Sequence, residues 1–500
     1  MEAKLKVAEK ECYNKSVFLH QRKEESRDAV VPDTQPDIAE VLFSGARVLI
    51  RSKDVSPGRV RIEAMVAASV LYRGEDGKLW SVEVSLPVLF SVDDARIGDS
   101  SQALARLSIV GVEAKALNPR KILLRAEIAA EISIYDKATV TCTERIGDGE
   151  FIRSRYKRTD ASLISAVTEK TFALTDEISL PPGAQQNGNI LCLGLESSVE
   201  DAKVVGTKLI IKGKIRSRLA LLGGDSELCH LEPLTEFSQI IELEREQGNG
   251  ASLVWLTPSG AYCSISQESE ARISLEFHMV AQLICREDVS LEYVNEVYSN
   301  CYELEVGKEE LCLEKVSQEL RGRESLRQLY ESSRAVREVL YSHVWTGKPS
   351  FERGKMLLPF NLIALCSGAE GIWCEKRSGE VVFRLGEKEG NFIVKRAEIM
   401  DWAILPLPGG IELRLEADME ILSCRDVKFS YVDGISYDPE KLIDNSARPS
   451  LVLLRLKRED ELWDIARENC SSVEAILSAN EIEEAAAAVG KLILIPKINC

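Results

Sequence analysis

The sequence lacks any uninterrupted apolar run of about 18 residues, the length that a helix needs to cross a bilayer. Its first thirty residues also lack the apolar core of a signal peptide. We therefore expect no integral membrane segment and a cytoplasmic location.

Residues suited to metal or catalytic chemistry are also scarce. The four histidines (His20, His230, His278 and His343) lie far apart, and neither a His-Glu-x-x-His nor a Cys-x-x-Cys spacing occurs, so we expect no metal site. The sequence contains no Walker loop, no Rossmann glycine fingerprint and no Gly-x-Ser-x-Gly elbow. These absences favour a protein that is not an enzyme and uses no cofactor. An enzyme with its site in an unrecognised β domain is the weakest alternative.

Cysteine is present, but not in a disulfide pattern. The 13 cysteines are odd in number, scattered, and mostly embedded in apolar strand-like segments. This distribution indicates buried thiols in a reducing compartment. Cys366 and Cys374 flank a predicted hairpin turn and fit core thiols better than metal ligands.

Basic residues are fewer than acidic ones, 63 Lys and Arg against 80 Asp and Glu, which gives a formal net charge of −17 at pH 7. A nucleic-acid partner or an anionic membrane surface would require clustered Lys and Arg, so both are disfavoured. The 500 residues are too many for one hydrophobic core, and 45% apolar residues are typical of globular protein. The length suggests three or four domains.

A β-rich pattern occurs three times along the chain. In each copy, alternating strands flank a turn rich in Gly and acidic residues, which tolerate the positive φ values of hairpin turns. The turns are residues 74–77, 223–226 and 368–371. Each copy closes with a second alternating strand, at residues 122–128, 273–279 and 411–417. We interpret the copies as duplicated β domains, with chance similarity among amphipathic strands as the alternative.

The copies are spaced by about 140 to 150 residues, much longer than solenoid repeats. We therefore expect β domains in series at residues 30–160, 161–295 and 296–438, followed by a linker at 439–448. A helical or flexible segment is predicted for 1–29. The charged stretch 309–340 is compatible with a helical connector.

The last 52 residues predict a separate small module. Apolar runs at 451–456 and 489–496 bracket two helical patterns, at 459–466 and 473–480. The predicted order for residues 449–500 is therefore strand, helix, helix, strand, an α+β (βααβ) unit beside a mainly β multidomain chain.

This module resembles a LysM domain, whose signature includes a Leu-Trp-x-Ile-Ala box, an Asn ending the second helix and a closing Gly-x-x-Leu-x-Ile-Pro. Here these read 462–466, Asn480 and 490–496. The entry motif at 31–38 and the ladder at 70–77 are similar to the SPOCS domain. Together the features resemble the SipL-type spore coat morphogenetic proteins of endospore-forming bacteria, which carry tandem SPOCS domains and a C-terminal LysM.

The resemblance implies a mother-cell protein that gathers on the forespore surface. It implies a structural, adaptor role in spore coat assembly, with the LysM domain docked on the basement-layer coat morphogenetic ATPase. Other coat proteins are candidate partners of the SPOCS domains.

The small sheet supports protein binding on physical grounds. Two helices cover only one face of a two-stranded sheet, yet both faces are apolar by sequence. We assign Leu451 and Leu453 to the same face as Ile493 and Ile495, and Trp463 is a candidate anchor or, equally, a core residue. The candidate partner-binding residues are Leu451, Leu453, Asp460, Leu462, Trp463, Asn480, Ile482, Ile493 and Ile495.

Glycan binding through the LysM-like module is the main alternative function. In LysM domains, the loop after the first strand contributes to the sugar site. Here Glu459 stands at the expected Gly and Glu461 at the expected Thr or Ser. Residues 449–500 also carry nine Asp and Glu against six Lys and Arg. An acidic module suits an anionic cell wall poorly, so peptidoglycan is disfavoured.

Overall fold

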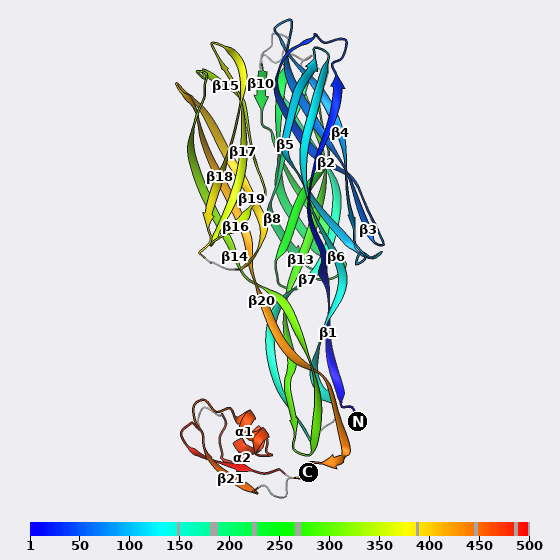
Figure 1. Cartoon of the computed structure of the whole chain (residues 1–500), viewed down its shortest axis with the longest axis vertical. Coiled ribbons are helices and arrows are strands. Elements are labelled where there is room, and N and C mark those ends of the chain that lie inside the picture. Colours follow the sequence, from blue (N-terminus) through cyan, green and yellow to red (C-terminus); the bar gives the residue numbers. More distant parts are fainter. Residues whose placement is uncertain are drawn as a thin grey trace.

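The computed structural model describes residues 1–147, 151–180, 189–222, 228–265, 272–386, 390–444, 449–484 and 489–498. The chain is mainly β and elongated, with a small helical module at one end (Figure 1). This confirms the predicted multidomain, β-rich fold class.

The strands fall into three units, of six, seven and seven described strands. Unit 1 (4–147) contains β1 (Lys4–Val30), β2 (Ile38–Ser56), β3 (Arg59–Gly74), β4 (Leu79–Asp93), β5 (Gln102–Asn118) and β6 (Lys121–Gly147). Unit 2 (152–299) contains β7 (Ile152–Ser179), β8 (Asn189–Val205), β9 (Lys208–Leu222), β10 (Leu228–Leu231), β11 (Leu234–Glu242), β12 (Ser252–Ile265) and β13 (Arg272–Ser299). Unit 3 (302–442) contains β14 (Tyr302–Glu331), β15 (Glu338–Thr346), β16 (Ser350–Glu352), β17 (Lys355–Gly368), β18 (Gly371–Arg384), β19 (Asn391–Leu407) and β20 (Gly410–Leu442).

Each unit contains a sandwich of two antiparallel layers. One layer has the order β1-β6-β5, β7-β13-β12 or β14-β20-β19. The second layer is β2-β3-β4 in unit 1, β8-β9 with β10 and β11 in unit 2, and β18-β17 with β15 and β16 in unit 3. The recurrence of one pairing order accounts for the threefold pattern in the sequence. Units 1 and 2 also share a sheet, through the pair Tyr13 and Ile164.

The closing strands form the centre of each sandwich core. In β6, Ile122, Leu124, Ala126 and Ile128 are all buried while the alternate side chains turn away from that core. β13 and β20 repeat the pattern in cores 2 and 3. The predicted alternation at 122–128, 273–279 and 411–417 is confirmed, and each buried Ile or Leu contributes about 1.5–3 kcal/mol.

Two of the three predicted hairpin turns are present. Gly77 joins β3 to β4 with φ of 78°, and Gly371 begins β18 with φ of 99°. Both values lie in the left-handed region that favours glycine. The third predicted turn, 223–226, lies outside the described residues.

The long strands leave the sandwiches and form a stalk of three two-stranded ribbons (Figure 1). The ribbons pair 4–14 with 136–147, 152–160 with 290–299, and 302–316 with 424–442. Their apolar side chains meet along the middle of the stalk, where Cys142, Tyr293 and Phe429 come from units 1, 2 and 3. The Tyr293 and Phe429 ring centroids are 4.5 Å apart. The three units therefore share one stalk core.

Two predicted helical segments are strands, so these predictions are wrong. Segment 1–29 contains most of β1, which pairs with β6 along its length, and most of 309–340 lies in β14, which pairs with β20. Both strands expose many charged side chains, and cross-strand pairing outweighs their helix-compatible composition. The predicted boundaries at 160/161, 295/296 and 438/439 fall inside β7, β13 and β20.

Candidate functional site

The terminal module has the predicted order of elements. It consists of β21 (Leu451–Arg455), α1 (Leu462–Glu468), α2 (Val473–Ala479) and β22 (Leu492–Pro496). The strands pair antiparallel, with Val452 opposite Ile495 and Leu454 opposite Ile493. Opposed residues of an antiparallel pair share a face, so this register decides which side chains meet the helices.

The inner face of this sheet packs on α1 and α2. Ile493 and Ile495 are buried in one cluster with Leu462, Ile465 and Ile476. Assigning Ile493 and Ile495 to the face of Leu451 and Leu453 was therefore wrong. Leu462 is likewise a core residue. All three leave the candidate partner-binding set.

The outer face of the sheet is apolar and exposed. Leu451, Leu453 and Leu492 are 50%, 59% and 64% exposed. The register places Leu494 and Pro496 on the same face, together with Arg455. We call this set, Leu451, Leu453, Leu492, Leu494 and Pro496, the outer face. Of the predicted site residues, it retains Leu451 and Leu453.

Asp460 and Asn480 bind backbone groups of the module itself. The Asp460 carboxylate accepts a hydrogen bond from the Lys457 amide at 2.9 Å. The Asn480 side chain accepts from the Leu494 amide at 2.7 Å and donates to the Leu494 carbonyl at 2.6 Å. Asn480 thus occupies the edge of β22 as a neighbouring strand would, and its role is structural.

Trp463 lies at the contact between the module and the stalk. Its ring meets that of Tyr298, on β13, edge to face with centroids 4.8 Å apart. The Tyr298 hydroxyl donates to the Ser471 carbonyl at 3.0 Å, and the Arg155 guanidinium lies 2.6 Å from the Glu461 carboxylate. Trp463 therefore contacts this chain's own stalk.

Ile482 is half-buried at the edge of the module core. It also borders a shallow groove of about 450 Å³, lined by Asn480–Glu484 and Lys491–Ile493. The groove carries the carboxylates of Glu481, Glu483 and Glu484.

A larger cavity, of about 840 Å³, lies where the three units meet. Its walls carry Glu196 from unit 2 and His343 and Glu398 from unit 3. Burial raises the pKa of both glutamates to about 7 and lowers that of His343 to about 3. Sequence reasoning missed these residues because no local motif marks them, and only the packing of distant strands brings them together.

The structure offers no metal centre within its described ranges, since no group of three or more His, Cys, Asp or Glu side chains is placed to hold an ion. Cys366 is a buried thiol, and burial raises its pKa to about 12. Cys301 is disulfide-bonded, one departure from the expected free thiols.

Among the described helices, none has both the length and the apolarity to span a bilayer.

Comparison of the chain with protein-family models, with curated proteins and with solved structures finds no match.

Proposed function

We propose that this protein is a non-enzymatic structural adaptor in endospore coat assembly, with a LysM-like module that docks on the basement-layer coat morphogenetic ATPase at the forespore surface. In this proposal the three units are SPOCS-like domains of a mother-cell protein. The observation that carries the docking role is the outer face, where three leucines at least half exposed lie on the same side of the sheet.

The apolar surface of the module is incompletely buried. The module buries its inner face on its own helices and its Trp463 edge on the stalk, yet leaves the outer face in water. Covering the exposed part of each leucine with a partner would contribute about 1 kcal/mol. Clustered apolar surface of this kind typically marks a protein interface.

The test is capture of the purified coat ATPase by full-length protein and by the variants Leu453→Arg and Leu492→Arg. We expect at least a tenfold loss of capture, because each variant puts a charge into the contact. The matched control is Leu329→Arg, on β14, where a leucine 64% exposed lies outside the module. Equal capture by all four proteins would refute docking through the outer face.

A cell-wall sedimentation assay separates this function from glycan binding. The adaptor function predicts no enrichment of the protein with purified peptidoglycan. Pelleting that Glu481→Lys or Glu483→Lys alters, while Leu453→Arg does not, would instead place a glycan in the groove beside α2.

A further inference from the structure

The 840 Å³ cavity between the three units is built from strand edges. Its walls include segments of β2, β5, β8, β12, β15 and β19. Exposed Glu200, Asp201 and Asn249 lie at its rim, so the cavity is accessible from solvent. Its volume is within the range of ordinary ligand sites.

Each of these six strands is the last strand of its sheet. Such a strand pairs on one side and directs the backbone N–H and C=O groups of its other side outward. Regular pairing runs through the wall at 43–50 in β2 and 252–258 in β12, whereas a register shift falls inside the wall segments of β5, β8 and β19. A regular free edge repeats its donors and acceptors every second residue, a spacing that another extended backbone matches.

One edge shows how such groups are satisfied. The Ala105 amide of β5 donates to the Gln282 side chain at 2.6 Å, and the same amide group of Gln282 donates back to the Ala105 carbonyl at 2.7 Å. Gln282 is buried and comes from unit 2, so a side chain of one unit takes the position of a strand beside another. A bound peptide would make the same pair of bonds along a longer run.

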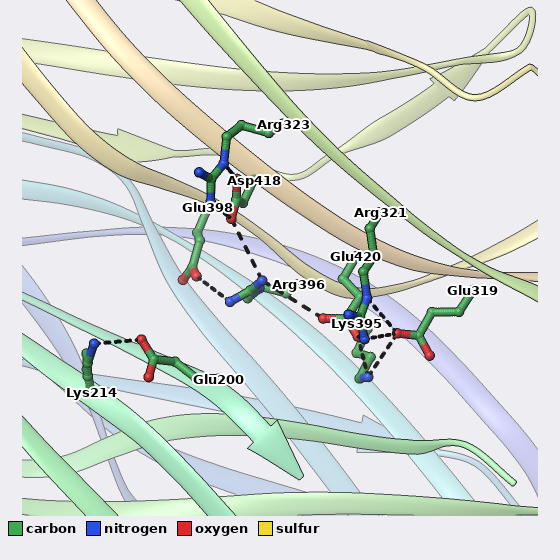
Figure 2. Close-up of polar contacts among 10 residues, drawn as sticks. All are labelled: Glu200, Lys214, Glu319, Arg321, Arg323, Lys395, Arg396, Glu398, Asp418 and Glu420. Carbon is green, nitrogen blue, oxygen red and sulfur yellow. Dashed lines mark hydrogen bonds and ion pairs between the residues drawn. The ribbon is translucent and has the colours of Figure 1, made fainter.

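The wall carries cations as well as carboxylates. Of these cations, Arg106 and Arg286 pair with Glu131 and Glu314. On unit 3, Arg321 and Lys395 are committed to the carboxylates of Glu319 and Glu420 (Figure 2). Arg396 is shared, since its guanidinium lies 3.5 Å from Glu398, 3.9 Å from Asp418 and 4.0 Å from Glu420.

The carboxylate of Glu398 therefore shares its cation, Arg396, with two other carboxylates. Its Oε1 is buried and accepts no hydrogen bond from a described residue, and a second carboxylate of the cavity wall, Glu196, acts on it electrostatically. Burial first, and then the charge of Glu196, raise the pKa of Glu398. Glu196 has Arg218 at 3.6 Å, yet burial still raises its pKa. A ligand cation beside the two carboxylates would relieve both effects.

We propose that this cavity binds an extended polypeptide segment, which pairs with the free strand edges and places a lysine or arginine side chain by Glu196 and Glu398. The segment belongs to a partner protein, and the site is independent of the outer face of the terminal module. Backbone pairing holds the segment with little regard to sequence, while the two carboxylates select the basic residue.

The test uses the full-length protein and arrays of nine-residue peptides, with random flanks and lysine, arginine, norleucine or glutamate fixed at the centre. We expect binding to the lysine and arginine sets only. The best binder, made again with N-methyl groups on alternate residues, should bind at least tenfold more weakly, because it cannot donate to a strand edge. No binding in any set, or equal binding by the N-methylated peptide, would overturn the proposal.

Two further measurements locate the site. Glu398→Gln should weaken the best peptide about tenfold, whereas Glu416→Gln, an exposed carboxylate on β20 away from the cavity wall, should not. Calorimetry at pH 7 in buffers of different ionisation enthalpy should detect proton release on binding, and less of it in Glu398→Gln. Equal effects of the two variants, or spermidine that competes as well as the peptide, would contradict a peptide site. Circular dichroism melts confirm that both variants are folded.

Discussion

Arg218 offers the sharpest test of how units 2 and 3 are joined. Its side chain, on β9, is fully buried and paired with the carboxylates of Glu196, at 3.6 Å, and Glu232. Its guanidinium carbon also lies 3.5 Å from the ring centroid of Trp402, on β19 of unit 3. Arg218→Met keeps much of the volume but removes the charge from all three contacts.

The expected cost follows from what is left behind. Removing one partner of a fully buried ion pair costs about 3–5 kcal/mol. The side chains of Glu196 and Glu232 keep about one third of their surface exposed, which moves the ionic cost toward the lower end of this range. A desolvated cation–π contact is worth up to about 2 kcal/mol. We therefore expect a loss of about 3 kcal/mol in the local free energy of opening, or roughly a hundredfold faster exchange.

Hydrogen exchange measured by mass spectrometry on fragments from β9 and β19 reports this local opening. The matched control is Lys212→Met, an exposed cation on the same strand, which should leave exchange unchanged. Adding Glu196→Gln and Glu232→Gln to Arg218→Met should restore part of the protection, because no unpaired carboxylate remains. If Arg218→Met exchanges like Lys212→Met, the buried cation does not hold the units together.

Three further predictions concern single side chains. Burial raises the pKa of Glu398 from its ordinary value of 4.5 to about 7, so the folded state loses stability from this group as pH rises between those values. The melting temperature of Glu398→Gln should therefore equal that of the wild type at pH 4.5 and exceed it at pH 8. Asn480→Ala should destabilise the module by about 1–3 kcal/mol, seen as loss of protection of the Leu494 amide. Tyr298→Phe removes the hydrogen bond to Ser471 and should lower the free energy of opening of the module by about 1 kcal/mol. The measurement is the rate of proteolysis of the module, which should rise modestly.

Alternation of apolar residues was enough to predict the closing strands. In β6, β13 and β20 one face is buried in a sandwich core, so the sequence shows period two directly. In β1 and β14 many side chains are charged and half-exposed, and their partners lie between 79 residues (Glu331 and Gly410) and 143 residues (Lys4 and Gly147) away in the sequence. Their strand conformation comes from non-local pairing, which local composition does not encode.

The terminal module shows a different limit of prediction from sequence. Its elements were predictable from periodicity, but the faces of its strands depend on the register of Leu451 with Pro496. A shift of one residue exchanges the two faces, and two helices separate the strands, so no turn fixes the register in advance. That is why Leu451 and Leu453 were placed correctly as exposed residues while Ile493 and Ile495 were not. The cavity of Glu196 and Glu398 could not be predicted for a related reason, because the edges of six strands from three units have to converge before it exists.

The three-ribbon stalk has a consequence for biosynthesis. Its core needs Cys142, Tyr293 and Phe429 together, so it is incomplete until residue 429 has left the ribosome. The first two sandwiches can close earlier on the nascent chain, but their ribbons then wait with apolar sides uncovered. Chains released before about residue 430 should consequently be the aggregation-prone products of translation. A chaperone would be needed most when a ribosome stalls in the last fifth of the message.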